Sequence, residues 1–144
     1  MIPSWLDPAK EITGPLWSPS REDFIFTCFD LLRKLGVPQG RAAEVVANSA
    51  VETGWGRGRE SDPPELRGVL GHNLGGVKAH RPWSGPWWRK AGHQSSGDPP
   101  VCFYKAYPSL EAFFESWLGT YVPKPPNRGR YAKTGQAFHG NGDW

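Results

Sequence analysis

The side chain whose type and position best suit chemistry is Glu52, which lies in the last turn of an expected helix before Gly54. The C-terminal end of a helix carries partial negative charge and disfavours a second negative charge on the carboxyl group. Trp55 is expected to remove water from the same place, which also favours the neutral acid. A carboxyl group that stays protonated near neutral pH can act as a general acid toward a leaving oxygen atom.

Tryptophan is unusually frequent in this chain, with eight Trp among 144 residues. A buried indole N–H needs a hydrogen-bond partner, so placing all eight in one core would be costly. We expect some of them to line a groove and the others to lie in the core and at its rim. Flat apolar rings in a groove suit sugars, whose C–H faces pack on them.

Other kinds of chemistry find little support in the sequence. The four His residues are too scattered to have the spacing of zinc ligands. Cys28 and Cys102 each lie in an apolar segment without a second Cys nearby, so both are expected to be buried thiols. No Gly-x-Ser-x-Gly motif is present. We therefore expect no metal, no cofactor and no nucleophilic triad.

Length and charge limit the possible partners. A chain of 144 residues is expected to form one domain, and we expect a monomer. The net charge of +3 fits a polyanionic partner. No run of five Lys or Arg and no nucleic-acid fold signature occurs, so we expect no nucleic acid partner. Residues 1–20 lack the basic start and apolar run of a signal peptide, and no stretch approaches the roughly 20 apolar residues of a membrane span.

The elements that must position Glu52 follow from hydrophobic spacing and capping residues, which predict a mostly helical α+β fold. Residues 1–19 are expected to be an extended lead-in, with Trp5, Leu6, Leu16 and Trp17 docking on the domain formed by residues 20–144. Helices are expected from Ser20 to Gly36, from Pro38 to Gly54, from Ser109 to Tyr121 and over Tyr131–Phe138. Residues 73–79 and 100–106 are expected to be two strands, joined by a Gly-, Pro- and Ser-rich connection.

Four segments of the chain resemble glycoside hydrolase family 73, the bacterial and phage N-acetylglucosaminidases. They are Ala50 to Gly56 (Ala-Val-Glu-Thr-Gly-Trp-Gly), Asn73 to Lys78 (Asn-Leu-Gly-Gly-Val-Lys), Phe103 to Ser109 (Phe-Tyr-Lys-Ala-Tyr-Pro-Ser) and Arg130-Tyr131. They follow the family's order, with similar separations, across residues 20–139. Each motif alone is weak, and together they are fairly specific.

The resemblance implies a lysozyme-like helical domain with a small β-hairpin lobe beside a substrate groove. It implies hydrolysis of the β-1,4 bond between GlcNAc and MurNAc in bacterial peptidoglycan, with Glu52 as the general acid. Trp55, Asn73, Lys78, Trp83 and Tyr107 are then expected to bind or border the substrate. In the family's strand motif Phe is usual where this chain has Gly75, which leaves either a wider groove or room for a Trp.

The sequence departs from the family at the second carboxylate. Many members have a Glu between the two strands, whereas the only carboxylate between Trp83 and Asp98 is Asp98 itself. Two-carboxylate hydrolysis needs a base or nucleophile opposite the acid. Asp98 is one candidate, and the acidic residues of the loop after Glu52 are others, namely Glu60, Asp62 and Glu65. The third possibility is the substrate's own N-acetyl oxygen, with Tyr131 helping to hold it.

Two alternative functions stay open on the sequence alone. A lytic transglycosylase would use Glu52 alone and return the sugar's 6-hydroxyl group onto C1. A catalytically inactive wall-binding or phage structural module would keep the groove without turnover, and the missing Glu motivates this alternative. In each case the protein acts on the cell wall, and we expect delivery by a phage or a secretion device.

Overall fold

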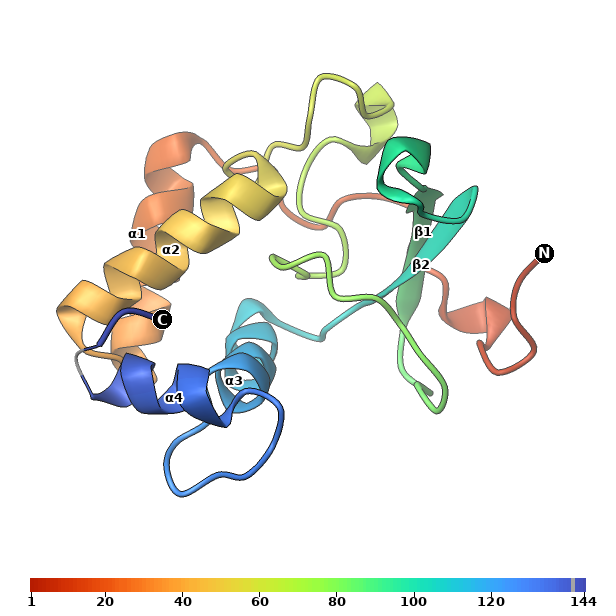
Figure 1. Cartoon of the computed structure of the whole chain (residues 1–144). Helices are drawn as coiled ribbons and strands as arrows, with labels where there is room; N and C mark the ends of the chain where they lie inside the picture. Colours follow the sequence, from red (N-terminus) through yellow and green to blue (C-terminus); the bar gives the residue numbers. More distant parts are fainter. Residues whose placement is uncertain (141) are drawn as a thin grey trace.

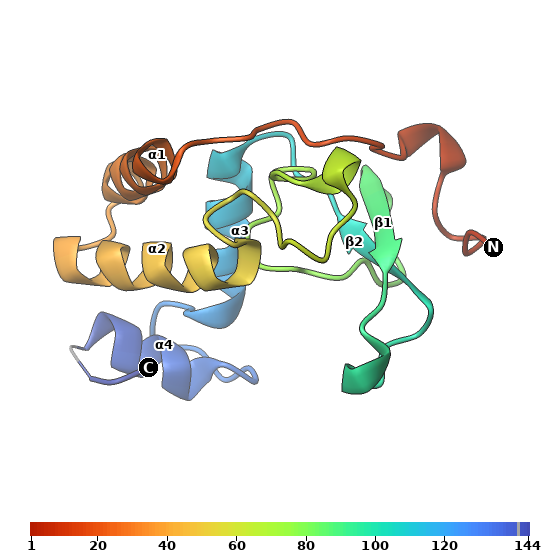
Figure 2. The same cartoon turned by 90° about the horizontal axis from the view of Figure 1, so that it is seen from above.

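Helices gather at one side of the molecule and a hairpin lies at the other (Figures 1 and 2). The computed structural model describes residues 1–140 and 142–144. This part of the chain contains four α-helices and one two-stranded sheet, which confirms the mostly helical α+β class. In chain order the elements, with η for a 3-10 helix, are η1 (Pro8–Lys10), α1 (Arg21–Lys34), α2 (Gln39–Thr53), η2 (Pro64–Leu66), β1 (Trp87–Ala91), η3 (Gln94–Ser96), β2 (Val101–Lys105), α3 (Leu110–Tyr121) and α4 (Ala132–His139).

The helices begin and end at the capping residues that the sequence contains. The hydroxyl group of Ser20 accepts the backbone N–H of Asp23 at 3.1 Å and caps α1. The hydroxyl group of Ser109 caps α3 in the same way, with the N–H of Ala112 at 3.0 Å. Gly54 ends α2 in the left-handed conformation, with a φ of 57°. All four expected helices are therefore confirmed, with boundaries within a few residues.

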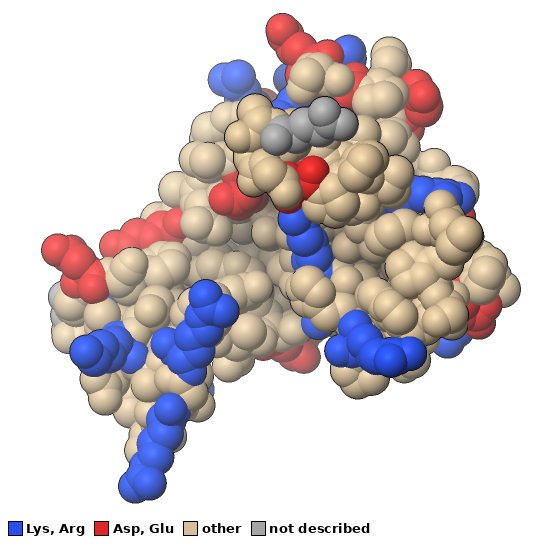
Figure 3. Space-filling view, turned by 45° about the vertical axis from the view of Figure 1, so that its right-hand side comes forward, with Lys and Arg blue, Asp and Glu red and all other residues tan. Residues whose placement is uncertain are grey.

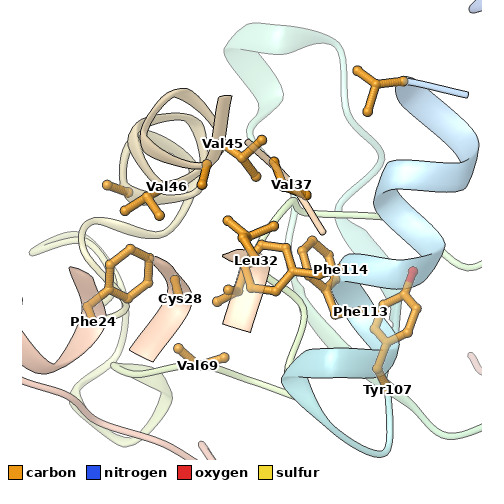
Figure 4. Close-up of a cluster of buried hydrophobic side chains, with 14 of the residues drawn as sticks. Phe24, Cys28, Leu32, Val37, Val45, Val46, Val69, Tyr107, Phe113 and Phe114 are labelled. Atoms are coloured by element: carbon orange, nitrogen blue, oxygen red, sulfur yellow. The ribbon is translucent and has the colours of Figure 1, made fainter. Parts of the chain in front are cut away.

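The main core fills the space between α1, α2 and α3, and Figure 4 shows its side chains converging there. Side chains spaced four apart on α1 make its buried face. The buried members of this core are Phe24, Cys28, Leu32, Val37, Ala42, Val45, Val46, Ala50, Val69, Leu74, Tyr107, Phe113, Phe114, Val122 and Phe138. Because α2 is anchored in this core, its last turn has a fixed position relative to the rest of the molecule.

The hairpin consists of β1 and β2, which pair antiparallel with Trp87 opposite Lys105 and Ala91 opposite Val101. The strand expected over residues 100–106 is confirmed. The expectation that residues 73–79 form its partner is wrong, because β1 lies within the stretch expected to be a connection. Trp87 and Trp88 are both buried and polar residues follow them, so β1 lacks the alternation by which a strand is recognised.

The segment expected to be the first strand forms a turn because Asn73 folds the backbone onto itself. The side-chain oxygen of Asn73 accepts the N–H groups of Gly75 at 3.2 Å and Val77 at 3.1 Å. Its amide nitrogen donates to the carbonyl of Val77 at 2.9 Å. The segment then contacts β2 through the isolated bridge between Lys78 and Tyr104. It therefore lies between the helices and the hairpin instead of adding a strand to the sheet.

The lead-in, residues 1–19, runs from the hairpin back to α1 (Figure 2). Leu6 is buried in a small cluster with Ala79 and Trp87. The indole N–H of Trp87 donates to the carbonyl of Asp7 at 2.7 Å. The lead-in thus covers one face of the hairpin and connects it to the helices.

Three of the four apolar lead-in residues expected to dock do so. Leu6 is buried, and Trp5 and Trp17 are half-buried. Leu16 is 54% exposed, so the expectation that it docks is wrong. The backbone N–H of Leu16 donates to the carbonyl of Val69 at 3.0 Å, which holds the chain here while the side chain faces solvent.

Within the described residues, we find no helix with the length and apolar character needed to cross a bilayer.

Candidate active site

Glu52 occupies the last turn of α2, and its side chain is exposed at a cavity of about 230 Å³. The helix ends immediately after it because Gly54 turns into the left-handed region. The hydroxyl group of Thr53 donates to the carbonyl of Ser49 at 2.7 Å and accepts the N–H of Gly56 at 2.9 Å. These bonds fix the backbone on both sides of Glu52.

The cavity lies between the end of α2, the loop that follows it, the Asn73 turn and the hairpin. Figure 3 shows acidic and basic side chains close together in the middle of one face of the molecule. The lining residues are Glu52, Thr53, Gly58, Arg59, Asp62, Leu66, Gly68, Leu70, Asn73, Gly75, Gly76, Lys78, Trp88, Lys90, His93 and Tyr104. Of the predicted site residues, Glu52, Asn73 and Lys78 are therefore brought together at one cavity.

Two ion pairs each join an Asp to a Lys that lines the cavity. Lys78 contacts the Asp98 carboxylate at 2.8 Å, and Lys90 contacts the Asp62 carboxylate at 2.6 Å. The hydrogen bond from Lys78, followed by that from the His93 backbone N–H, lowers the pKa of Asp98 below its usual value. The same hydrogen bond raises the pKa of Lys78. Asp98 is thus held as a carboxylate by a partner that lines the cavity.

Asp62 is the buried carboxylate of this cavity, with only 6% of its surface exposed. Burial by itself raises the pKa of Asp62, but the hydrogen bonds from Lys90 and the Arg59 backbone N–H outweigh burial and lower it. The Asp62 carbonyl also accepts Arg67 Nε at 3.1 Å. These contacts tie the loop after α2 to β1, so Asp62 holds two walls of the cavity together.

The four acidic residues considered as second catalytic groups have different surroundings. Asp62 lines the cavity and Asp98 contacts a lining residue, yet both carboxylates are engaged by Lys side chains. Glu60 and Glu65 are exposed on the loop and do not line the cavity. Within residues 1–140 and 142–144, Glu52 is therefore the one cavity-lining carboxylate without an ion-pair partner.

Asn73 lines the cavity, but its side chain is fully used by the protein. Besides its bonds within the turn, its amide nitrogen donates to the carbonyl of Lys105 at 2.9 Å. The residue is 5% exposed. Asn73 therefore shapes the wall that carries Gly75 and Lys78.

Trp55, Trp83 and Tyr107 lie outside the cavity lining. The Trp55 ring packs edge-on against Phe24, with centroids 6.4 Å apart, and Arg21 lies over it at 5.6 Å. The expectation that Trp55 removes water from Glu52 is thus not met, because its ring packs against α1 and Glu52 is exposed. Trp83 and Tyr107 contact each other, with ring centroids 6.3 Å apart.

Tyr131 precedes α4 and is half-buried. Its ring packs edge-on against Tyr121, with centroids 5.0 Å apart, and Arg130 lies over it at 5.5 Å. It does not line the cavity that contains Glu52. The structure thus places Tyr131 beside the helices, on a surface shared with α3.

Sequence reasoning missed the hairpin's contribution to the cavity. Trp88 and Tyr104 stack across β1 and β2, with centroids 4.3 Å apart and an interplanar angle of 15°. Both line the cavity, and burial raises the pKa of the Tyr104 phenol to about 12. Lys90 belongs to the same strand as Trp88. The pairing of β1 with β2 brings these residues together, and the sequence gives no signal for that pairing when β1 itself is not recognised.

The space that Gly75 leaves open is occupied by aromatic rings of α3. A Cβ atom on Gly75 would lie 3.3 Å from Phe113 and 3.4 Å from Trp117. The second of the two expectations for this position, room for a Trp, is therefore confirmed. Because Gly75 lines the cavity, the ring of Trp117 lies next to a residue of the cavity wall.

The described residues contain no group of three or more His, Cys, Asp or Glu arranged to hold a metal ion. Cys28 and Cys102 are free and buried, as expected. Burial raises the pKa of the Cys28 thiol to about 12, so this thiol stays protonated and unreactive.

Neither the known family models nor the curated proteins include a match to this chain. Among solved structures, a truncated glycoside hydrolase domain of FlgJ from Salmonella typhimurium is similar, with 20% identity and a TM-score of 0.54 over 87% of this chain and 86% of that one. A mutant peptidoglycan hydrolase from Sphingomonas sp. A1 is similar, with 26% identity and a TM-score of 0.50 over 74% of this chain and 68% of that one. The chain spans 64% of the wild-type Sphingomonas structure.

These neighbours establish the fold as that of a lysozyme-like glycoside hydrolase domain. They agree with the resemblance to glycoside hydrolase family 73 that the four sequence motifs indicate.

Proposed function

We propose that this chain is a glycosidase that cleaves bacterial peptidoglycan, with Glu52 as its general acid. The observation that carries the proposal is the position of Glu52, which is exposed at a cavity between the helices and the hairpin and has no ion-pair partner among the described residues. The fold is that of solved glycoside hydrolase domains. The Sphingomonas neighbour, described as a peptidoglycan hydrolase, supports this substrate.

The reaction needs the leaving sugar oxygen to gain a proton as its bond to C1 breaks. Glu52 supplies this proton, and positive charge develops on the ring that keeps C1. We propose that the bond cleaved is the β-1,4 bond after GlcNAc, which makes the protein an endo-β-N-acetylglucosaminidase. The support for this choice of bond is the motif resemblance around Glu52, Asn73 and Tyr131.

The second catalytic group is proposed to be the substrate itself. Asp62 and Asp98 are held by lysines, with pKa values below the usual range, so neither is an unpaired base at the cavity. The N-acetyl oxygen of the substrate can attack C1 from the face opposite the leaving group, and water then opens the resulting ring. Tyr131, the candidate from the sequence to orient the N-acetyl group, does not line the cavity that contains Glu52, so we do not propose it for that role.

The same observation favours a lytic transglycosylase as the second candidate function. Such an enzyme uses one carboxyl group, first as an acid and then as a base toward the sugar's own 6-hydroxyl group. The absence of an unpaired second carboxylate among the described cavity residues fits this reaction equally well. The two reactions differ in their products, since hydrolysis leaves a reducing end and transglycosylation leaves an anhydro end.

The test is mass spectrometry of the products released from purified peptidoglycan by the wild-type chain and by Glu52→Gln. We expect reducing GlcNAc ends from the wild type and a rate at least about 100-fold lower for the variant. Glu22→Gln is the matched control, since Glu22 is an exposed residue of α1. It should keep the wild-type rate.

Other outcomes each decide between alternatives. Reducing MurNAc ends would mean that the other bond is cut, and anhydro-MurNAc ends would identify a transglycosylase. If the folded wild-type chain binds peptidoglycan in a sedimentation assay but releases no products, the enzyme proposal is wrong and the chain is a binding module. The proposed route to the wall is still delivery by a phage or a secretion device.

A further inference from the structure

A row of aromatic rings leads from the Glu52 cavity along the helical part of the molecule. Gly75 lines the cavity, and the indole edge of Trp117 lies next to it. The ring of Tyr121 is 5.7 Å from that of Trp117, and the ring of Tyr131 is 5.0 Å from that of Tyr121. Successive contacts therefore connect the cavity to α3 and then to the start of α4.

All three residues of this row are partly accessible to solvent. Trp117, Tyr121 and Tyr131 are each half-buried, and the Trp117 ring also packs edge-on against Trp144, with centroids 5.9 Å apart. In Figure 1 the end of α2, the Asn73 turn, α3 and the start of α4 follow one another down the middle of the view. Half-exposed Trp and Tyr rings provide an apolar face and a polar tip, the combination that suits a sugar ring.

The far end of this row meets a cationic segment. Residues 116–142 contain four Lys or Arg residues and no Asp or Glu. The four are Lys124, Arg128, Arg130 and Lys133, all exposed, and none forms an ion pair within the described residues. Basic side chains project at the lower left of Figure 3. Arg130 lies over the ring of Tyr131, so the cations adjoin the aromatic row directly.

We propose that Trp117, Tyr121 and Tyr131 form a sugar-binding strip that extends the groove beyond the Glu52 cavity. We further infer that the cations at its end bind the carboxylates of the peptides attached to the glycan. The strip then selects an anionic, peptide-bearing glycan over a neutral one. This inference rests on the proposed function, since it names how the same site recognises its substrate.

The experiment measures binding in the Glu52→Gln background, where turnover is suppressed, by isothermal titration calorimetry. One ligand is a soluble, peptide-bearing glycan strand from peptidoglycan, and the other is a neutral β-1,4 oligomer of N-acetylglucosamine. The strip variant is Trp117→Leu with Tyr121→Leu, and its control is Phe26→Leu, an exposed ring on α1. Tyr121→Leu alone is also measured, because Trp117 packs against the core.

We expect the strip variant to lose about tenfold in affinity for both ligands, since two stacking rings are removed. The Tyr121→Leu variant should lose about threefold, and the Phe26→Leu control should bind like its parent. If the folded Tyr121→Leu variant and the folded double variant both bind as tightly as the parent, the strip proposal is wrong.

The cations are tested with Arg128→Gln/Arg130→Gln, and Lys34→Gln/Arg57→Gln is the control of equal charge. The first pair should weaken binding of the peptide-bearing strand about tenfold in low salt and leave the neutral oligomer unaffected. Equal losses for both ligands would overturn the role of the cations. If hydrofluoric acid treatment of the strand, which removes phosphate polymers, abolishes the difference, the anion recognised is phosphate and the carboxylate proposal is wrong.

These results do not depend on turnover. If the wild-type chain releases no products but the strip variants still lose binding, the proposed enzyme activity fails while the strip proposal stands. If products are released and the strip variants bind normally, the proposed enzyme activity stands and the strip proposal fails.

Discussion

At the scale of single residues, Asp62 has an unusual combination of burial and charge. It is 6% exposed, its carboxylate contacts Lys90 at 2.6 Å, and its pKa lies below the usual value of 3.8. A carboxyl group with a lowered pKa in the folded state stabilises the fold above its unfolded pKa. That contribution is lost as the pH falls through the folded pKa, because the unfolded chain binds the proton first.

We therefore expect Asp62→Asn to be less stable than the wild type at pH 7 and to depend less on pH below about 4. Urea unfolding at a series of pH values from 7 to 2 measures both effects. Asp30→Asn, which alters an exposed carboxylate on α1, should keep the wild-type pH dependence. An Asp62→Asn variant as pH-dependent as the wild type would show that the Lys90 pair does not stabilise the fold.

Individual residues also show how much of the site could be predicted from the sequence and how much could not. Glu52 became a candidate because a carboxyl group before a terminating Gly at the end of a helix is a local pattern, and the resemblance of the surrounding motif to family 73 implies its role as the acid. The Lys90–Asp62 contact joins residues far apart along the chain. Neither residue belongs to a local sequence pattern that indicates the contact, so it could not be predicted. Asn73 was placed correctly at the cavity, yet its four hydrogen bonds depend on a turn that its motif did not indicate.

At the scale of elements, the end of α2 decides where Glu52 lies. Gly54 has a φ of 57°, and a Cβ atom there would lie 2.6 Å from the Gly58 carbonyl oxygen. A side chain at this position strains the backbone and pushes the following loop away from the helix.

Gly54→Ala should therefore destabilise the protein by about 2 kcal/mol and lower its activity at least about tenfold. Gly40→Ala is the matched control, because Gly40 lies in the first turn of α2 with nothing within 4 Å of an added Cβ atom. The control should be about 0.5–1 kcal/mol more stable, with unchanged activity. Urea unfolding and product release measure the two effects, and equal behaviour of the two variants would contradict the expectation.

The elements were not equally predictable, and the reason is physical. Helices are specified by neighbours in sequence, such as Ser20 with Asp23 and Ser109 with Ala112, so their boundaries were predicted well. A strand is completed by a partner elsewhere in the chain. The Asn73 segment has apolar residues around two Gly, so it was predicted as a strand. β1 was not predicted as a strand, because its charged residues do not alternate with apolar ones.

At the scale of the whole molecule, the lead-in connects the hairpin to the helices. Leu6 is 3% exposed against Ala79 and Trp87, whereas Leu16 in the same segment is 54% exposed. The Arg89 side chain of β1 also contacts Glu11 at 2.7 Å. The stability of the hairpin should therefore depend on one face of the lead-in.

Leu6→Ala should cost about 2–4 kcal/mol, and Leu16→Ala should change stability by less than about 0.5 kcal/mol. Hydrogen exchange followed by mass spectrometry should show faster exchange in β1 and β2 for the first variant, with the helices still protected. Uniformly faster exchange throughout Leu6→Ala would instead mean that the hairpin and the helices unfold as one unit.

The contact between Asp7 and Trp87 has a consequence for how the protein is made. The two residues are 80 positions apart, so the lead-in leaves the ribosome well before its partner strand exists. At about 5–20 residues per second, it waits on the order of ten seconds with Trp5 and Leu6 uncovered. During synthesis the lead-in can therefore dock only after β1 has emerged.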